Sequence, residues 1–402
     1  MQGKTTFVVG LQYGDEGKGK IVDYLAEKSD VVVRGNGGAN AGHTIVLKDG
    51  QALALHQIPS GIAYDNTLNI IGNGCFLDPV KLADEIMDAE SKGLVISPDN
   101  LKISKTAHLV LPIHKQKDEE RESGTKGQGT TKSGIAFVAA DKALREGIRA
   151  EVIEESTKEE LVKLGGKEFG EAAFELANYL CDSVELIQQS ISDKKKLLVE
   201  GAQAFGLDIN HGKYPYSTSS DTTVSGLMSG TGINYRQVGR VIGIAKAIPS
   251  KVGGGPFVTI IKDEDIAAKA RGEKGKVDSE FGATTGRERE VGYLDLVALK
   301  RSVQVNGIDE IALTKFDCIN RHGAVTKIAV AYMFKGKKVT SPPSSGVELY
   351  ECEPVYEELP TWQDNDSPEA GKYIKFIEDY LGVPVTMLGV GPNREDLIIR
   401  EN

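Results

Sequence analysis

Short apolar runs alternate with polar or glycine-bearing turns along the chain. Four β-type runs, residues 7–9, 197–199, 311–313 and 385–388, each end in such a turn. In an open parallel sheet, ligands bind outside the carboxyl ends of the strands. These four turns are therefore expected to line one crevice although they lie far apart in sequence. This convergence predicts an enzyme that acts on a nucleotide.

Helical signals separate these runs. Asp78 is expected to be an N-cap, with Pro79 at the first helical position and Gly93 as the stop. One face of that helix is predicted from four apolar positions: Val80, Ala83, Ile86 and Met87. The pair Ser156 and Glu159 fits a capping box and opens a helix-rich stretch that runs to about Gln189. The pattern predicts an α/β fold: a large, mostly parallel central sheet flanked by helices, with a P-loop-like phosphate-binding loop and helical and loop insertions.

The first loop has the order strand, glycine loop, helix, and comprises Gly14, Asp15, Glu16, Gly17, Lys18, Gly19 and Lys20. Backbone N–H groups in such a loop can surround a phosphate at a helix N-terminus. The loop lacks the Walker spacing and its final Ser or Thr, so an ordinary βα turn fits it almost as well. Asp15 and Glu16 add carboxylates, which suits either a bound cation or a carboxylate that moves a proton.

Two further stretches carry chemistry. Lys315 and Asp317 stand in the sequence T-K-F-D, in which a carboxylate can accept two parallel hydrogen bonds from guanine. The segment 281–289 combines two arginines with two threonines, which suits a dicarboxylate or a phosphate. A surface turn with ion pairs to Glu288 and Glu290 is the alternative interpretation of that segment.

Composition narrows the class of protein. The 402 residues are 40% hydrophobic and 26% charged, and the net charge of −10 argues against a nucleic-acid surface. The four cysteines are widely spaced and predict reduced packing thiols, and His108 and His114 are expected to be structural. No signal-like stretch precedes the first strand, and no run approaches the ~18 apolar residues of a membrane span. A cytoplasmic protein with no membrane partner is expected.

The stretches GDEGKGKIVDYLAEK and NAGHT resemble those of adenylosuccinate synthetase, and the resemblance runs from Val8 to Arg400. It implies one domain over residues 1–402, with a helical insertion at about 141–190. It also implies a GTP-dependent carbon–nitrogen ligase that takes the first committed step of AMP synthesis. Such an enzyme forms adenylosuccinate from IMP and L-aspartate through a 6-phosphoryl intermediate, and releases GDP and phosphate.

The resemblance assigns a role to each site residue. It implies a catalytic group made of the base Asp15, the acid His43, Lys18 and Gln203. Mg²⁺ is implied at Asp15 and the carbonyl oxygen of Gly42. The GTP residues implied are Gly14, Asp15, Glu16, Gly17, Lys18, Gly19, Lys20, Gly42, His43, Thr44, Arg289, Lys315, Phe316, Asp317, Gly389, Val390 and Gly391. The IMP residues are Asp15, Glu16, Gly17, Lys18, Asn40, Ala41, Gly42, His43, Thr131, Arg145, Gln203, Thr218 and Arg287. The aspartate residues are Ala283, Thr284, Thr285, Gly286, Arg287, Glu288 and Arg289.

Arg145 is further implied to cross the interface of a homodimer. The sequence departs from the family at Tyr13, where Trp is usual, in the segment 132–140, and in a shorter region between Arg149 and Gln203.

Two rival functions are a phage-type enzyme that uses deoxyguanylate and ATP, and a GTP-binding switch. Asp15 and Asp317 argue against the first, and the Arg287 loop has no role in the second.

Overall fold

The computed structural model describes residues 5–47, 50–124, 127–276, 278–281 and 288–400. Its main sheet has ten strands in the order β10-β8-β6-β2-β11-β1-β12-β16-β20-β21. β10, β8, β6, β2, β11 and β1 pair with one another in parallel, as do β12, β16 and β20. The last pair, β20 with β21, is antiparallel. The predicted α/β class with a large, mostly parallel sheet is confirmed.

The chain divides into two compact units, and each is built from several segments. The first holds residues 1–8, 19–202 and 218–240, and the second holds 9–18, 203–217 and 241–402. The chain therefore passes between the units five times. Four of these passages flank just two segments, the loop 9–18 and the turn 203–217.

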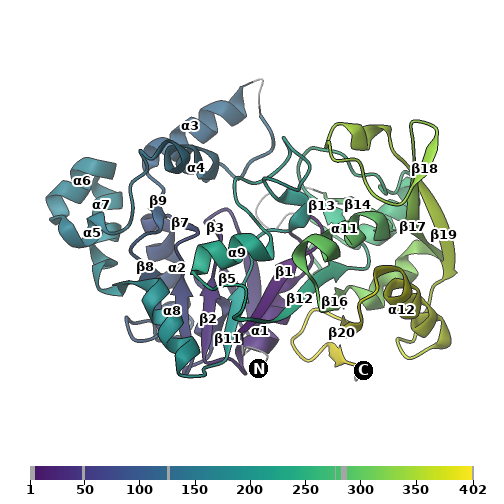
Figure 1. Ribbon diagram of the computed structural model, residues 1–402, viewed down its shortest axis with the longest axis horizontal. Helices are drawn as coiled ribbons and strands as arrows, with labels where there is room; N and C mark the ends of the chain where they lie inside the picture. The colour runs from purple at the N-terminus through teal and green to yellow at the C-terminus, as the bar shows by residue number, and fades with distance from the viewer. Residues whose placement is uncertain (1–4, 48–49, 125–126, 277, 282–287, 401–402) are drawn as a thin grey trace. The chain divides into compact units, whose positions relative to one another are not determined.

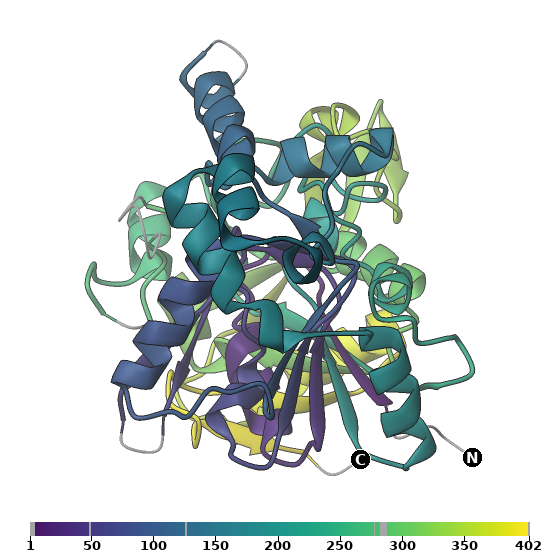
Figure 2. The ribbon, with the colours of Figure 1, turned by 90° about the vertical axis from the view of Figure 1, so that its left-hand side faces the viewer.

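The first unit contains six parallel strands with helices around them. In Figure 2 its purple and blue strands are seen behind these helices. The strands are β1 (Thr5–Gly10), β2 (Val31–Arg34), β6 (Leu68–Ile71), β8 (Leu101–Ser104), β10 (Leu180–Cys181) and β11 (Leu197–Glu200), and the helices are α1 (Lys18–Ala26), α2 (Pro79–Ser91), α3 (Pro112–Ser123), α4 (Ile135–Leu144), α5 (Val152–Glu155), α6 (Lys158–Gly165), α7 (Lys167–Glu175), α8 (Ser183–Ser192) and α9 (Val224–Thr231). Figure 1 shows α6 packed on α7 beside α5.

Five short strands complete this unit. They are β3 (Gly37–Gly38), β4 (His43–Val46), β5 (Ala52–Leu55), β7 (Cys75–Leu77) and β9 (His108–Leu109). β4 and β5 form an antiparallel pair. Together with β6, β8 and α2 these strands enclose an aliphatic core around Leu53, Leu55, Leu77 and Ile103, all fully buried.

Helix α2 begins as predicted, because Asp78 caps it and accepts a hydrogen bond from the N–H of Lys81 at 3.3 Å. Its predicted face was wrong at Met87, which is 60% exposed. Glu85 is buried instead, and its carboxylate accepts the backbone N–H groups of residues 56–58 at 2.7–3.2 Å. Satisfying these buried donors turns the helix away from the face expected from apolar spacing alone.

The second unit carries the other strands of the main sheet and a smaller sheet that contains both parallel and antiparallel pairs. The main strands are β12 (Val238–Lys246), β16 (Glu310–Thr314), β20 (Val385–Gly389) and β21 (Leu397–Ile399); the smaller sheet is β15 (Leu294–Asp295), β17 (Val325–Phe334), β18 (Lys337–Val339) and β19 (Glu353–Pro360); β13 (Ser250–Lys251) pairs with β14 (Glu290–Val291). The helices are α10 (Glu264–Arg271), α11 (Leu296–Asn306) and α12 (Pro368–Leu381). The four cysteines are free, as predicted.

Candidate active site

The glycine loop joins β1 to α1 in a tight turn. Gly10 allows it, because a Cβ there would lie 2.8 Å from both the carbonyl oxygen of Gln203 and the Cβ of Ala204. Gly14 has a φ of +104°, which a larger residue rarely adopts. The strand before the loop is buried, and the helix begins at Lys18. The predicted strand, loop and helix order is confirmed.

Glu16 turns its side chain into this loop. Its carboxylate accepts the N–H of Gln12 at 3.1 Å and that of Gly14 at 2.8 Å, and it pairs with the ammonium of Lys18 at 2.8 Å. Burial alone would raise the pKa of Glu16, but Lys18 and the loop N–H groups lower it overall. An ionised carboxylate therefore fixes the loop from inside.

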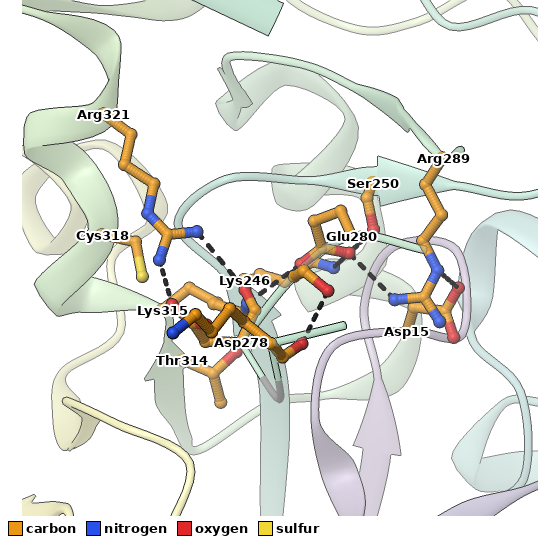
Figure 3. Close-up of polar contacts among 12 residues, drawn as sticks. Asp15, Lys246, Ser250, Asp278, Glu280, Arg289, Thr314, Lys315, Cys318 and Arg321 are labelled. Atoms are coloured by element: carbon orange, nitrogen blue, oxygen red, sulfur yellow. Dashed lines mark hydrogen bonds and ion pairs between the residues drawn. The ribbon is translucent and has the colours of Figure 1, made fainter. Parts of the chain in front are cut away.

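Asp15 points outward by contrast. Its side chain is 34% exposed, and one oxygen lies 3.3 Å from the Nε of Arg289. Figure 3 shows this pair at one end of a chain of polar contacts. Of the two loop carboxylates, Asp15 is thus the one that a substrate can reach.

The turn after β16 lies against the glycine loop. Thr314 donates a hydrogen bond from its hydroxyl to the carbonyl oxygen of Glu16 at 2.6 Å. The next residues form the T-K-F-D turn, in which Lys315 has a left-handed φ of 56° and Asp317 is half-buried. Gly389 at the end of β20 approaches closely, since a Cβ there would lie 3.2 Å from the Cα of Thr314. The structure thus brings the candidate phosphate loop and the candidate guanine residues together within the second unit.

His43 is the centre of a second group, which lies in the first unit. Its Nε2 is 2.7 Å from the hydroxyl of Ser60 and 3.5 Å from a carboxylate oxygen of Glu200. Glu200 also accepts the N–H of Ser60 at 3.0 Å and lies 3.8 Å from Arg34. Burial raises the pKa of Glu200, yet His43 and Arg34 lower it overall. A Cβ on Gly19 would be 3.0 Å from that of His43, so the imidazole lies beside the first turn of α1.

Two candidate IMP residues carry buried polar atoms that have no hydrogen-bond partner in the described part of the chain. They are the side-chain amide of Gln203, both of whose polar atoms are enclosed, and the amide oxygen of Asn40. Gln203 also has a left-handed φ of 58°. A buried amide without partners costs about 1–3 kcal/mol, so these groups fit residues that await a polar ligand.

The remaining candidates are placed less centrally or fall outside the described residues. Thr131 and Arg145 are exposed, and Thr131 donates to the hydroxyl of Ser133 at 2.9 Å. Glu288 is exposed and lies 3.7 Å from Arg271. Thr218 is half-buried, Ala41 is buried, and Gly42 and Thr44 are exposed. Five of the predicted aspartate residues, 283–287, lie outside the described part of the chain.

Comparisons with known proteins now decide the family. A family model described as Adenylosuccinate synthetase matches residues 7–398. The chain belongs to the adenylosuccinate synthetase family. It is 44% identical to the adenylosuccinate synthetase of Caldicellulosiruptor bescii over 98% of this chain and 99% of that one. It is 43% identical to that of Caldanaerobacter subterraneus over 99% of each.

Solved structures agree. A fully ligated adenylosuccinate synthetase from Plasmodium falciparum matches with a TM-score of 0.90 and 35% identity, over 99% of this chain and all of that one. A cyanophage S-2L succinoaminodeoxyadenylate synthetase bound to dGMP and dATP matches with a TM-score of 0.66 over 99% of this chain and 96% of that one; at 21% identity it shows the fold alone. The predicted family and the predicted class, a GTP-dependent ligase of purine biosynthesis that joins IMP and aspartate, are confirmed.

Sequence reasoning missed three residues of these groups. Ser60 lies beside His43, Lys246 ends β12, and Glu280 accepts a hydrogen bond from Lys246 and pairs with Arg289. Lys246 could have been found as a polar residue at the end of an apolar strand.

None of the described helices is long and apolar enough to cross a membrane.

Proposed function

We propose that this chain performs the family reaction with the two groups of residues described above. The observation that carries the proposal is the hydrogen bond from Thr314 to Glu16, because it joins the phosphate loop to the T-K-F-D turn in one unit. A nucleotide held at both ends by these segments would present its γ-phosphate at the loop. Lys315, Phe316, Asp317 and residues 389–391 would hold the guanine, and residues 14–20 and 42–44 would hold the phosphates.

The first step is phosphorylation of IMP on O6. Asp15 takes the proton from N1, and O6 then attacks the γ-phosphorus while the bond to the β,γ-bridging oxygen breaks. Asp15 suits this role because it is the outward carboxylate of the loop. The unpartnered amide of Gln203 supports its role beside the purine, and Asn40, Thr131, Thr218 and Arg287 complete the proposed IMP set.

His43 and Lys18 act on the charge that leaves toward the β-phosphate. An imidazole held by Ser60 and Glu200 has a fixed orientation, which a general acid needs. The ammonium of Lys18 lies in the loop, anchored to Glu16. In the second step the amine of aspartate displaces the 6-phosphoryl group and gives adenylosuccinate and phosphate. Arg289, Glu288 and residues 283–287 are proposed to bind that aspartate.

The site offers the small number of protein ligands that Mg²⁺ usually takes. Mg²⁺ prefers one or two carboxylates together with substrate phosphates to an all-protein cage. Asp15 offers such a carboxylate, and no cluster of three or more His, Cys, Asp or Glu that could hold a metal occurs among the described residues. We propose that Asp15 and the carbonyl oxygen of Gly42 hold the ion, which would neutralise phosphate charge when bound.

The proposal includes a homodimer in which Arg145 reaches the partner's IMP. Arg145 ends α4 in a left-handed conformation with a φ of 66°, is exposed, and forms no ion pair within the described residues. An exposed cation held out by a helix end is available to an anion from outside the subunit. The cytoplasm as its compartment remains a prediction.

A substrate-omission assay tests the function. The purified protein is given IMP, GTP and aspartate with Mg²⁺, and the purine absorbance is followed while each component is left out in turn. Product should require all three substrates. GTP hydrolysis that ignores IMP and aspartate would favour a GTP switch, and turnover of deoxyguanylate with ATP would favour the phage-type reaction.

A further inference from the structure

Glu280 occupies a buried position between segments that are distant in sequence. Its backbone N–H donates to the carbonyl oxygen of Arg271 at 2.7 Å, and its own carbonyl oxygen accepts the N–H of Arg289 at 3.0 Å. Its residue exposure is 2%. The main chain therefore fixes where this carboxylate lies, before any contact of the side chain is considered.

The carboxylate of Glu280 forms ion pairs with three cations. Glu280 accepts hydrogen bonds from the ammonium of Lys246 at 3.0 Å, the hydroxyl of Ser250 at 2.6 Å and the guanidinium of Arg289 at 2.9 Å. Its other oxygen lies 3.3 Å from the ammonium of Lys315. Figure 3 shows Glu280 between Lys246, Lys315 and Arg289, with Asp15 beyond the arginine. The ends of two strands and the approach to β14 thus meet at one side chain.

The fold alone gives a weak reason for this arrangement. A buried ion pair often stabilises no more than a well-packed apolar pair would, because desolvation offsets the attraction. Burial raises the pKa of Glu280, but Lys246 and Lys315 lower it overall, so the group stays ionised. Two of its three cations belong to the residues implied for GTP. Lys315 lies in the T-K-F-D turn, and Arg289, which is also proposed for aspartate, lies 3.3 Å from Asp15 of the phosphate loop.

Each of these two cations has a second acceptor nearby. Arg289 lies 3.3 Å from Asp15, and Lys315 donates to the carbonyl oxygen of Asp278. Without the charge of Glu280, the buried Lys246 and the partly buried Arg289 and Lys315 would face a neutral group, and their mutual repulsion would favour these alternative acceptors. Arg289 and Lys315 would then leave their positions together.

We propose that Glu280 is a positioning residue for the guanine nucleotide, whose single carboxylate fixes Arg289 at the phosphates and Lys315 at the base. The inference rests on the proposed function. It means that the protein's hold on the base and its hold on the phosphates depend on one shared side chain. A substitution that weakens binding of the base should then also weaken binding of the phosphates.

Equilibrium binding of GDP tests this role in two backgrounds. Glu280→Gln keeps the shape and removes the charge, and we expect it to weaken GDP binding about tenfold or more in the wild-type chain. In an Arg289→Met, Lys315→Met background the same change should weaken binding less than twofold, since the carboxylate has no nucleotide residue left to position. An equal loss in both backgrounds would mean that the carboxylate only supports the fold, and would overturn the proposal.

Two further variants sharpen the test. Glu290→Gln is the matched control, because Glu290 follows Arg289, is exposed and pairs with Lys251 at 3.2 Å; it should change GDP binding less than twofold. Glu280→Asp keeps the charge but alters the shape, and should bind GDP more tightly than Glu280→Gln. If Glu280→Asp binds GDP no more tightly than Glu280→Gln, positioning by charge is refuted. If Glu280→Gln fails to fold, Glu280→Asp is compared in the two backgrounds instead, and an equal loss of GDP affinity in both refutes the proposal. A wild-type chain that binds neither GDP nor GTP would instead refute the proposed function.

Discussion

Replacing Asp15 by Asn should remove catalysis while leaving the stability of the protein almost unchanged. The amide keeps the shape of the side chain and cannot take a proton from N1 of IMP. Loss of a general base costs ~10²- to 10⁴-fold in rate. At ~1.36 kcal/mol for each factor of ten, this is about 2.7–5.4 kcal/mol of transition-state stabilisation.

The structural cost should be far smaller. Asp15 is 34% exposed and its described ion pair, with Arg289, has its closest atoms 3.3 Å apart. Ion pairs that solvent can reach contribute about 0–1 kcal/mol, and Asp15 remains open to solvent in this pair. Arg289 also keeps its hydrogen bond to Glu280 at 2.9 Å in the variant. We therefore expect kcat to fall at least a hundredfold while the free energy of unfolding changes by less than about 1 kcal/mol.

The assay measures both quantities on the same preparation. Initial rates of adenylosuccinate formation give kcat at saturating substrates, urea denaturation gives the free energy of unfolding, and titration with GDP shows whether the loop still binds nucleotide. Glu290→Gln serves as the matched control for loss of an exposed carboxylate. A variant that keeps more than about a tenth of wild-type kcat would remove Asp15 from the role of base.

Three other changes test different parts of the proposal. Asp317→Asn should lower the preference for GTP over ATP, because an amide sets a donor against a donor of guanine; an unchanged ratio of kcat/KM values would refute the guanine assignment. Equal mixing of Asp15→Asn and Arg145→Leu subunits should restore about a quarter of wild-type activity, because half the dimers are mixed and each has one intact site; no recovery would mean that Arg145 acts within its own chain. Burial lowers the pKa of Lys213 to about 7, so the unfolded chain binds more protons than the folded chain between about pH 7 and about pH 10. The free energy of unfolding of the wild type, measured in urea relative to Lys213→Met, should therefore rise across that range. A difference between the two proteins that does not depend on pH would contradict this.

Local patterns predicted the elements and the strand ends that carry the site. The runs that became β1, β11, β16 and β20 were recognised because their apolar positions are uninterrupted and end in glycine or polar turns. Some boundaries slipped where two patterns overlap. The capping box was expected at Ser156 with Glu159, but Thr157 and Glu160 form it, since both pairs fit the same motif one residue apart.

Contacts between distant segments could not be predicted in this way. Glu280 and the three cations around it are spread over some seventy residues and have no characteristic spacing. The same holds for Ser60 and Glu200 beside His43, which are 140 residues apart. Their roles depend on which strands become neighbours, and periodicity within one segment carries no information about that.

The alternation of the chain between its two units has a consequence for how the enzyme is made. The second unit takes its phosphate loop from residues 9–18 and its T-K-F-D turn from a segment that begins at residue 241. During synthesis the loop therefore leaves the ribosome long before the strand that holds it, and Glu16 has no Thr314 to bind until more than three-quarters of the chain exists. Nucleotide affinity should consequently appear only after β16 has been synthesised. If the chain is cut anywhere between the loop and β16, neither fragment should bind the nucleotide.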